Sequence, residues 1–226
     1  PRSEATSESF DDYRLPSRSA DRTIPVKRGE KYGFLGEKLD IILRCKYRKA
    51  RAFFNGRAAV FDSGGWSWVN REGEFVVDDR FEEVGNFSAS GWAPAFDGEK
   101  WYAVDKSGER RQLKRVSVVG ERFCNGLIRA EEPSTGLYGY IDHTGKFVIS
   151  AKFSRARPFS NGLGAVRFRK DGNETDAYIY TNGSVAFEID NGESLGRFLG
   201  GYARVRTRDR RGYVNRSGEW SWFTER

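Results

Sequence analysis

The sequence contains little of the chemistry that most catalytic and metal sites need. Its 226 residues include no methionine, one histidine and two cysteines. A single histidine excludes a zinc or iron site built from several histidines, and two cysteines exclude a disulfide framework or a cysteine-rich metal site. Apolar runs extend over only a few residues, which excludes a transmembrane helix. We therefore predict no metal, no cofactor and no membrane span.

Targeting signals are also missing. The chain begins with proline rather than methionine, and no signal peptide is visible. We interpret it as a processed product or a fragment whose targeting information has been removed. The compartment stays open, with a location outside the cytoplasm favoured.

Glycine and aromatic side chains are abundant, with 26 Gly, 17 Phe, 10 Tyr and 6 Trp. With a hydrophobic fraction of 38%, this composition can form a core and is not that of a disordered chain. The net charge of +7 is uneven, because residues 197–226 hold eight arginines and three acidic residues. A basic segment of this kind attracts an acidic protein, an anionic surface or nucleic acid.

The chain repeats itself from Lys31 onward. Laying residues 33–60 over residues 139–166 without a gap matches Gly33 with Gly139 and Phe53 with Phe159. Intermediate units each carry a turn glycine and then a phenylalanine, and these residues are Gly73, Gly108, Gly145, Gly183 and Gly218, and Phe53, Phe87, Phe123, Phe159 and Phe198. The spacing predicts tandem units of about 36 residues, with five full units and one half unit over residues 31–226.

Each unit has the pattern of three short strands. Alternating aromatic and β-branched residues, as in YGYID (138–142), are typical of a strand, and a polar turn ending in glycine is typical of a hairpin. A second strand follows, and after Asn-Gly a third, such as LGAVRF (163–168). The sequence therefore predicts an all-β fold of short antiparallel strands, in which each unit is a β-hairpin plus a third strand.

Residues 1–30 differ from the repeats, since they are rich in serine, arginine and acidic residues. We predict a flexible or linker segment, from which residues 23–28 could be recruited as a strand. Two overall shapes compete. Successive units form an open curved array, or the recruited strand supplies the third strand that the last unit lacks and closes a propeller-like ring. We favour the open array because the units diverge and their spacing drifts.

These units resemble the WG repeat, which is found mainly in bacterial proteins. Its pattern runs approximately Gly-Tyr-Ile-Asp-x-x-Gly-Lys, then aliphatics and an aromatic, then Phe-Ser-x-Gly-Leu-Ala-x-Val. The fourth unit, residues 138–168, matches it best as YGYIDHTGKFVISAKFSRARPFSNGLGAVRF. The first unit departs with Leu39 at the turn glycine, and the third with Ala103 at the Tyr140 position. The resemblance implies a β-rich scaffold with a binding role, in a family whose architecture serves many proteins.

Comparing the units position by position gives the candidate core and a candidate ligand shelf. The column of Ile141 is apolar in every unit, and the column of Tyr140, on the opposite face, is nearly always aromatic, so both faces are interpreted as covered. The column of Tyr138 accepts charge in the last units and is less buried. Its aromatics form a shelf for a glycan or peptide, or a ladder that packs repeat upon repeat; the shelf residues are Trp66, Trp101 and Tyr138.

Arginines supply a second candidate surface. Arg204, Arg206 and Arg208 alternate with other residues, so their guanidinium groups share one face of a strand. Arg167 and Arg169 hold equivalent positions one unit earlier, which predicts a basic stripe across two repeats. Arginine forks suit carboxylate or phosphate groups, although a solvated face that blocks edge pairing is the alternative.

Catalytic groups are sparse. His143 lies in a tight turn, which is a poor place for an oriented base. Asp142 shares its column with Asp105, Asn70 and Asn215, which indicates turn capping rather than charge-dependent chemistry. We predict a non-enzymatic scaffold that binds a macromolecular partner, preferably a protein with an acidic surface, through a broad face. Carbohydrate or cell-envelope binding through the Tyr138 column is the alternative. Nucleic acid is not favoured because no recognition motif accompanies the arginines, and a dispersed carboxylate enzyme ranks below binding.

Overall fold

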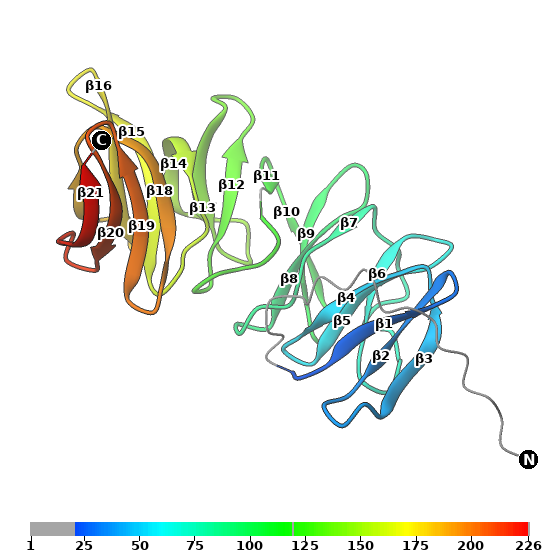
Figure 1. The fold of residues 1–226 in the computed structure, drawn as a ribbon. Helices are drawn as coiled ribbons and strands as arrows, with labels where there is room; N and C mark the ends of the chain where they lie inside the picture. Colours follow the sequence, from blue (N-terminus) through cyan, green and yellow to red (C-terminus); the bar gives the residue numbers. More distant parts are fainter. Residues whose placement is uncertain (1–20, 119, 226) are drawn as a thin grey trace, which may run out of the picture.

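The structure, a computed structural model, describes residues 21–118 and 120–225. These residues form 21 strands in five antiparallel sheets, and no helix occurs among them. Figure 1 shows the sheets following one another along the chain, with the first and last sheets at opposite ends of the molecule. The all-β prediction and the open array are confirmed. The predicted flexible lead falls mostly on residues 1–20, outside the described residues.

The strands are short and follow the sequence order within each sheet. The first sheet holds β1 (Ile24–Arg28), β2 (Lys31–Leu35) and β3 (Ile41–Tyr47). The second holds β4 (Lys49–Phe54), β5 (Arg57–Phe61) and β6 (Trp66–Val69), and the third holds β7 (Glu83–Val84), β8 (Trp92–Phe96), β9 (Trp101–Asp105) and β10 (Arg110–Leu113).

The fourth sheet has seven strands: β11 (Ser117–Val118), β12 (Ile128–Glu132), β13 (Leu137–Ile141), β14 (Phe147–Ala156), β15 (Leu163–Lys170), β16 (Asn173–Tyr180) and β17 (Val185–Ile189). The fifth holds β18 (Gly192–Leu199), β19 (Tyr202–Thr207), β20 (Arg210–Asn215) and β21 (Trp220–Glu225). The fourth sheet is large because β14 runs unbroken, whereas the equivalent stretch of the first unit is divided into β3 and β4.

The sheets are out of phase with the sequence units. Each sheet after the first joins the third strand of one unit to the hairpin of the next, as β15 pairs with β16 from Leu163↔Tyr180 to Lys170↔Asn173. The pairs β5–β6, β8–β9, β12–β13 and β19–β20 repeat this arrangement. Backbone hydrogen bonds therefore tie every unit to its successor, and no unit is an independent sheet.

The lead segment supplies the third strand of the first sheet. β1 pairs with β2 from Ile24↔Leu35 to Arg28↔Lys31, so the predicted recruitment of this segment occurs. It completes the first sheet rather than the last, which ends with β21 beside β20. The ring-closing alternative is not realised, because the strand that would close the ring is used at the opposite end of the array.

Both faces of the first hairpin strand are buried, as the columns predicted. The Tyr140 column is fully buried in five units, and the Ile141 column is buried from the second unit onward; these residues are Phe34, Trp68, Ala103, Tyr140 and Tyr178, and Val69, Val104, Ile141, Ile179 and Val214. Tyr213, the last member of the first column, is 43% exposed. No sheet covers its face in the described part of the chain.

One ring contact recurs inside the units. The column aromatic packs on the repeated phenylalanine, with ring centroids 4.6 Å apart for Tyr140–Phe159 and 5.0 Å apart for Tyr178–Phe198. Where the column aromatic is a tyrosine, its hydroxyl also donates a hydrogen bond to a backbone carbonyl. The Tyr140 hydroxyl donates to the Arg157 carbonyl at 2.6 Å, and the Tyr178 hydroxyl donates to the Gly196 carbonyl at 2.8 Å. Burial raises the pKa of both tyrosines, so they stay protonated donors.

Hairpin turns are capped by one oxygen in the Asp142 column. The Asp142 carboxylate accepts the backbone N–H groups of Thr144 and Lys146, and Asn70 does the same for Glu72 and Glu74. Burial alone would raise the pKa of Asp142. The Thr144 hydroxyl and these N–H groups outweigh it, so the pKa lies below its ordinary value. The turn-capping interpretation is confirmed.

The first prediction concerns the buried tyrosine hydroxyl. Tyr140→Phe should lower the free energy of unfolding by about 1–2 kcal/mol, because the Arg157 carbonyl loses its donor while the ring stays. Tyr213→Phe, at the uncovered end of the same column, should change it by less than about 0.5 kcal/mol. Urea unfolding of both variants measures the difference. Equal effects would contradict the role of this hydrogen bond.

The second prediction concerns pH. Because the pKa of Asp142 is lowered by folding, its stabilising contribution is present above its unfolded pKa and is lost as the pH falls through its folded pKa. Asp142→Asn should therefore be slightly less stable than the parent at neutral pH, with a difference that disappears in acid. Asp105→Asn removes the equivalent carboxylate, which caps the turn of the third unit and also has a lowered pKa, and it should show the same loss at neutral pH. A pH-independent difference in thermal unfolding would refute this explanation.

Candidate functional site

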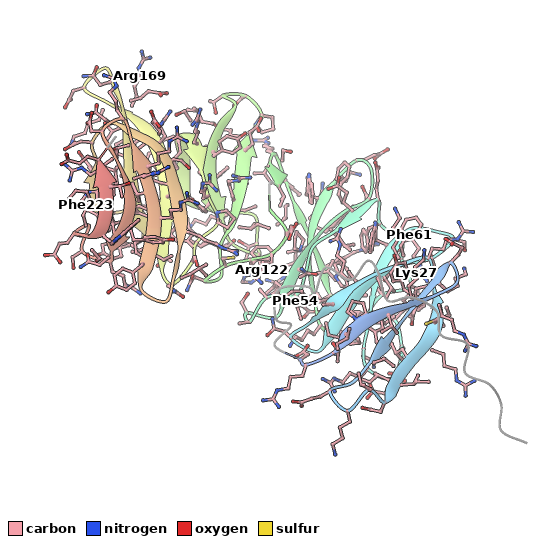
Figure 2. All side chains as sticks on the ribbon, viewed as in Figure 1. Lys27, Phe54, Phe61, Arg122, Arg169 and Phe223 are labelled. Carbon is pink, nitrogen blue, oxygen red and sulfur yellow. The ribbon has the colours of Figure 1, made fainter. Side chains whose placement is uncertain are left out.

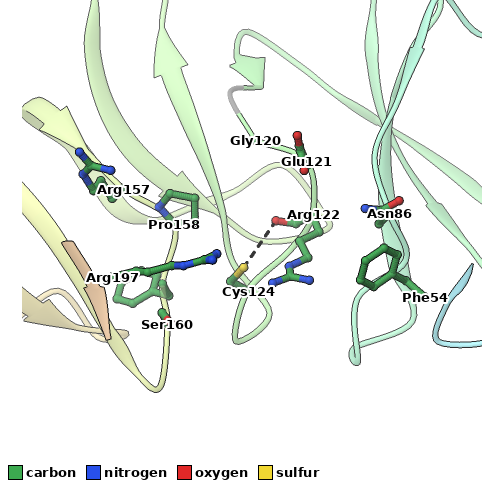
Figure 3. A pocket seen from close by; sticks show the side chains of 11 residues that line it. Phe54, Asn86, Gly120, Glu121, Arg122, Cys124, Arg157, Pro158, Ser160 and Arg197 are labelled. Atoms are coloured by element: carbon green, nitrogen blue, oxygen red, sulfur yellow. Dashed lines mark hydrogen bonds between the residues drawn. The ribbon is translucent and has the colours of Figure 1, made fainter. Parts of the chain in front are cut away.

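The segments around the repeated phenylalanines meet in a groove of about 510 Å³. We call it the central groove. Its lining residues lie between three positions before that phenylalanine and one position after it, and they come from all five full units; they include Phe54, Asn86, Arg122, Cys124, Arg157 and Arg197. Figure 2 places Arg122 and Phe54 near the middle of the array, and Figure 3 shows Arg197 extending from one side toward Arg122. A single groove is therefore built by residues far apart in sequence.

Hydrogen bonds between units hold these segments in place. The Asn55 amide donates to the Phe87 carbonyl at 2.8 Å, and the Ser160 hydroxyl donates to the Phe198 carbonyl at 2.6 Å. The Asn86 N–H donates to the Glu121 carbonyl at 2.6 Å. The walls of the central groove are thus backbone segments fixed by neighbouring units rather than free loops.

The central groove is positively charged. Arg122, Arg157 and Arg197 line it against one acidic residue, Glu121. The Arg122 guanidinium lies 5.9 Å from the centre of the Phe54 ring. Within the described residues, the guanidinium groups of Arg157 and Arg197 have no hydrogen bond, ion pair or ring contact. Unpaired guanidinium groups in a groove are ready to bind carboxylates or other oxyanions.

A second hollow, of about 370 Å³, adjoins the last sheet. We call it the arginine pocket. Its lining consists of four arginines and two small residues: Arg157, Arg204, Arg206, Arg211, Ser194 and Gly196. On β19 and β20, Arg206 lies directly opposite Arg211. Arg157 lines both the central groove and the arginine pocket, so the two hollows share one wall.

The predicted arginine stripe is distributed over different environments. Arg204 and Arg206 line the arginine pocket, whereas Arg208 is exposed outside its lining. Arg167 donates to both carboxylate oxygens of Asp176, at 2.9 and 2.7 Å, and its side chain is only 16% exposed. Arg169 lies at the tip of the β15–β16 hairpin, far from Arg122 in Figure 2. The structure therefore brings two of the five arginines together.

The predicted aromatic shelf lies on three sheets. Trp66, Trp101 and Tyr138 are all half-buried, and no ring contact joins any two of them within the part of the chain that the structure describes. Trp66 has the Arg51 guanidinium 4.6 Å from its ring centre. The Arg129 guanidinium lies 5.3 Å from the centre of the Tyr138 ring. Each ring already has a neighbour on its own sheet or an adjacent strand.

Sequence reasoning missed Arg122, Arg157 and Arg197. Their signal was present in the two columns before the repeated phenylalanine, which hold Arg51 and Arg157 in one and Arg122 and Arg197 in the other. These columns fall outside the alternating pattern that marks the strands in the sequence, although Arg51 lies within β4 and Arg197 within β18. Only the curvature of the array shows that they face one hollow.

Other candidate chemistry is structural. His143 stacks on Trp92 with ring centroids 4.5 Å apart, so this turn residue joins two sheets instead of standing free. Cys45 and Cys124 are unbridged, as expected. In residues 21–118 and 120–225, no cluster of three or more potential metal ligands occurs. The same residues contain no helix of the length and hydrophobicity needed to cross a membrane.

Three segments, residues 32–66, 66–101 and 138–173, match the model of the WG containing repeat. The protein contains WG repeats. The WG matches omit residues 102–137, the unit in which Ala103 replaces the column aromatic. The WG repeats are continuous with the divergent units at the C-terminal end, because the same strand pairing extends through β21.

Comparison with solved structures shows which known folds this chain resembles. A structure of the eukaryotic initiation factor is similar with a TM-score of 0.58 and 11% identity, over 91% of this chain and 63% of that one. The structure of Kluyvelomyces marxianus Hsv2 is similar with a TM-score of 0.50 and 11% identity, over 89% of this chain and 71% of that one. The WG-repeat chain thus spans less than two thirds of the first structure's length. No match to a curated protein was found. At these identities the likeness concerns the β-repeat fold alone.

Proposed function

We propose that this β-repeat scaffold is a non-enzymatic binding module that recognises an acidic protein partner through the central groove. The observation that carries the proposal is the convergence of Arg122, Arg157 and Arg197 from different units, two of them without an internal partner. Arginines held on a rigid frame lose little conformational freedom when they bind, so they suit a carboxylate-rich surface.

The titrating groups support binding over catalysis. The aspartates whose pKa is shifted, Asp62, Asp97, Asp105 and Asp142, all have a lowered pKa, set by hydrogen bonds or an arginine. A general acid needs the opposite shift, toward neutral pH. The one histidine is stacked on Trp92 rather than directed toward the central groove's lining.

The carbohydrate alternative has weaker support. A sugar-binding aromatic needs a free face, but Trp66 is already covered by Arg51 and by Phe61, whose ring centroid is 5.5 Å away. Trp101 packs beside Phe96 at 5.0 Å. These contacts favour the packing interpretation of the Tyr138 column and leave the central groove as the better candidate.

The third prediction tests the central groove with defined probes. The protein should bind peptides rich in aspartate and glutamate, but not neutral peptides of equal length, and high salt should weaken this binding. Arg122→Ser/Arg197→Ser should weaken it about tenfold, since two charge-assisted contacts are lost. The measurement is a dissociation constant from fluorescence anisotropy at low and high salt.

Arg44→Ser/Arg169→Ser is the matched control, because it removes the same charge from two exposed positions outside the central groove. Its dissociation constant should stay close to that of the parent. The proposal is wrong if both double variants bind alike, or if neutral peptides bind as tightly as acidic ones.

A further inference from the structure

Two arginines lie opposite each other on adjacent strands of the last sheet. Arg206 on β19 is the cross-strand partner of Arg211 on β20. Like charges placed directly opposite in a sheet destabilise it. The arrangement therefore costs stability in the free protein, and that cost is recovered when an anion lies between the two guanidinium groups.

In the preceding sheet the same two positions hold residues of opposite charge, so the pair is neutral. Arg167 on β15 faces Asp176 on β16, and these residues occupy the columns of Arg206 and Arg211. Arg167 binds both oxygens of the Asp176 carboxylate and also donates to the Gly192 carbonyl at 2.9 Å. The repeat can therefore satisfy its strand arginine internally. In the last sheet the internal anion is replaced by a second cation.

The surroundings add more positive charge than the sheet neutralises. Arg157 and Arg204 complete the arginine pocket, and no acidic side chain belongs to its lining. Glu193 pairs with Arg206 at 2.8 Å from outside that lining. Among the described residues, the Arg211 side chain has one hydrogen bond, to the Thr224 hydroxyl at 3.3 Å, and no ion pair. Four guanidinium groups against one carboxylate leave a surplus of three positive charges, enough to hold a doubly charged anion.

We propose that the arginine pocket is a binding site for a phosphate monoester group. Guanidinium forks bind phosphate oxygens in pairs, and a dianion neutralises the surplus better than a single carboxylate does. The volume of about 370 Å³ lies within the usual range of small-ligand sites. Tyr213 is the cross-strand partner of Arg204, and Trp222 lies beside it, both exposed. They offer an apolar surface to the remainder of the ligand.

The decisive variant is Arg211→Asp, which recreates in the last sheet the pairing of Arg167 with Asp176. The probe is inorganic phosphate, titrated by calorimetry against chloride at equal ionic strength. The parent should bind phosphate and not chloride, and Arg211→Asp should bind phosphate at least about tenfold more weakly. Without phosphate, Arg211→Asp should unfold at a temperature no lower than the parent, because the like charge opposite Arg206 is replaced by a second carboxylate partner beside Glu193. Loss of binding is then separated from loss of fold.

Arg169→Asp is the matched control, with the same charge reversal at a remote hairpin tip. It should bind phosphate as the parent does. Arg206→Gln, which removes one fork without reversing its charge, should also weaken binding and serves as a second variant. The proposal is overturned if Arg211→Asp binds phosphate as tightly as Arg169→Asp, or if phosphate has no effect beyond that of chloride.

Two further arms identify the source of the phosphate group. A peptide carrying a phosphorylated side chain is compared with its unphosphorylated form, and vesicles with phosphate-bearing headgroups are compared with neutral vesicles. The source is the one that binds more tightly than inorganic phosphate and loses that binding in Arg211→Asp. Arg211 lines the arginine pocket and not the central groove, so failure here leaves the central-groove test with Arg122 and Arg197 standing.

Discussion

The fold depends on the contact between a strand aromatic and the phenylalanine that follows the hairpin in the same unit. The pairs Phe34–Phe53, Trp68–Phe87, Tyr140–Phe159 and Tyr178–Phe198 have ring centroids 4.6 to 5.2 Å apart. In three of them the indole N–H or the tyrosine hydroxyl also donates a hydrogen bond to the carbonyl two residues before the phenylalanine. The rings bury apolar area, and the hydrogen bond fixes the segment that leads to the phenylalanine. Small sheets of three or four strands need such cover to be stable.

The functional surfaces follow from this arrangement. In the fourth and fifth units, the hydroxyls of Tyr140 and Tyr178 hold the segment before the repeated phenylalanine, and Arg157 and Arg197 on these segments line the central groove. Arg122 lines it from the equivalent segment of the third unit, where Ala103 replaces the aromatic residue. The last sheet differs because no unit covers its outer face in the described chain. The same strand positions that pair internally in Arg167 and Asp176 therefore become exposed at Arg206 and Arg211.

Much of the fold could be predicted because repeats allow comparison within one chain. The core columns and the turn caps at Asp142 and Asn70 follow from residue type and spacing. The central groove could not be predicted, since it depends on how far each sheet is rotated from the next. Arg167 was placed on a binding stripe because spacing along one strand does not show that Asp176 faces it on the next.

The central claim, that the aromatic pair sets the stability of each unit, is tested most directly by native-state hydrogen exchange. β9 and β13 are both paired on two sides, but Ala103 on β9 lacks the ring that Tyr140 supplies on β13. The amides of Trp101–Asp105 should open with a lower free energy than those of Leu137–Ile141. Equal protection of the two strands, or stronger protection around Ala103, would contradict the account.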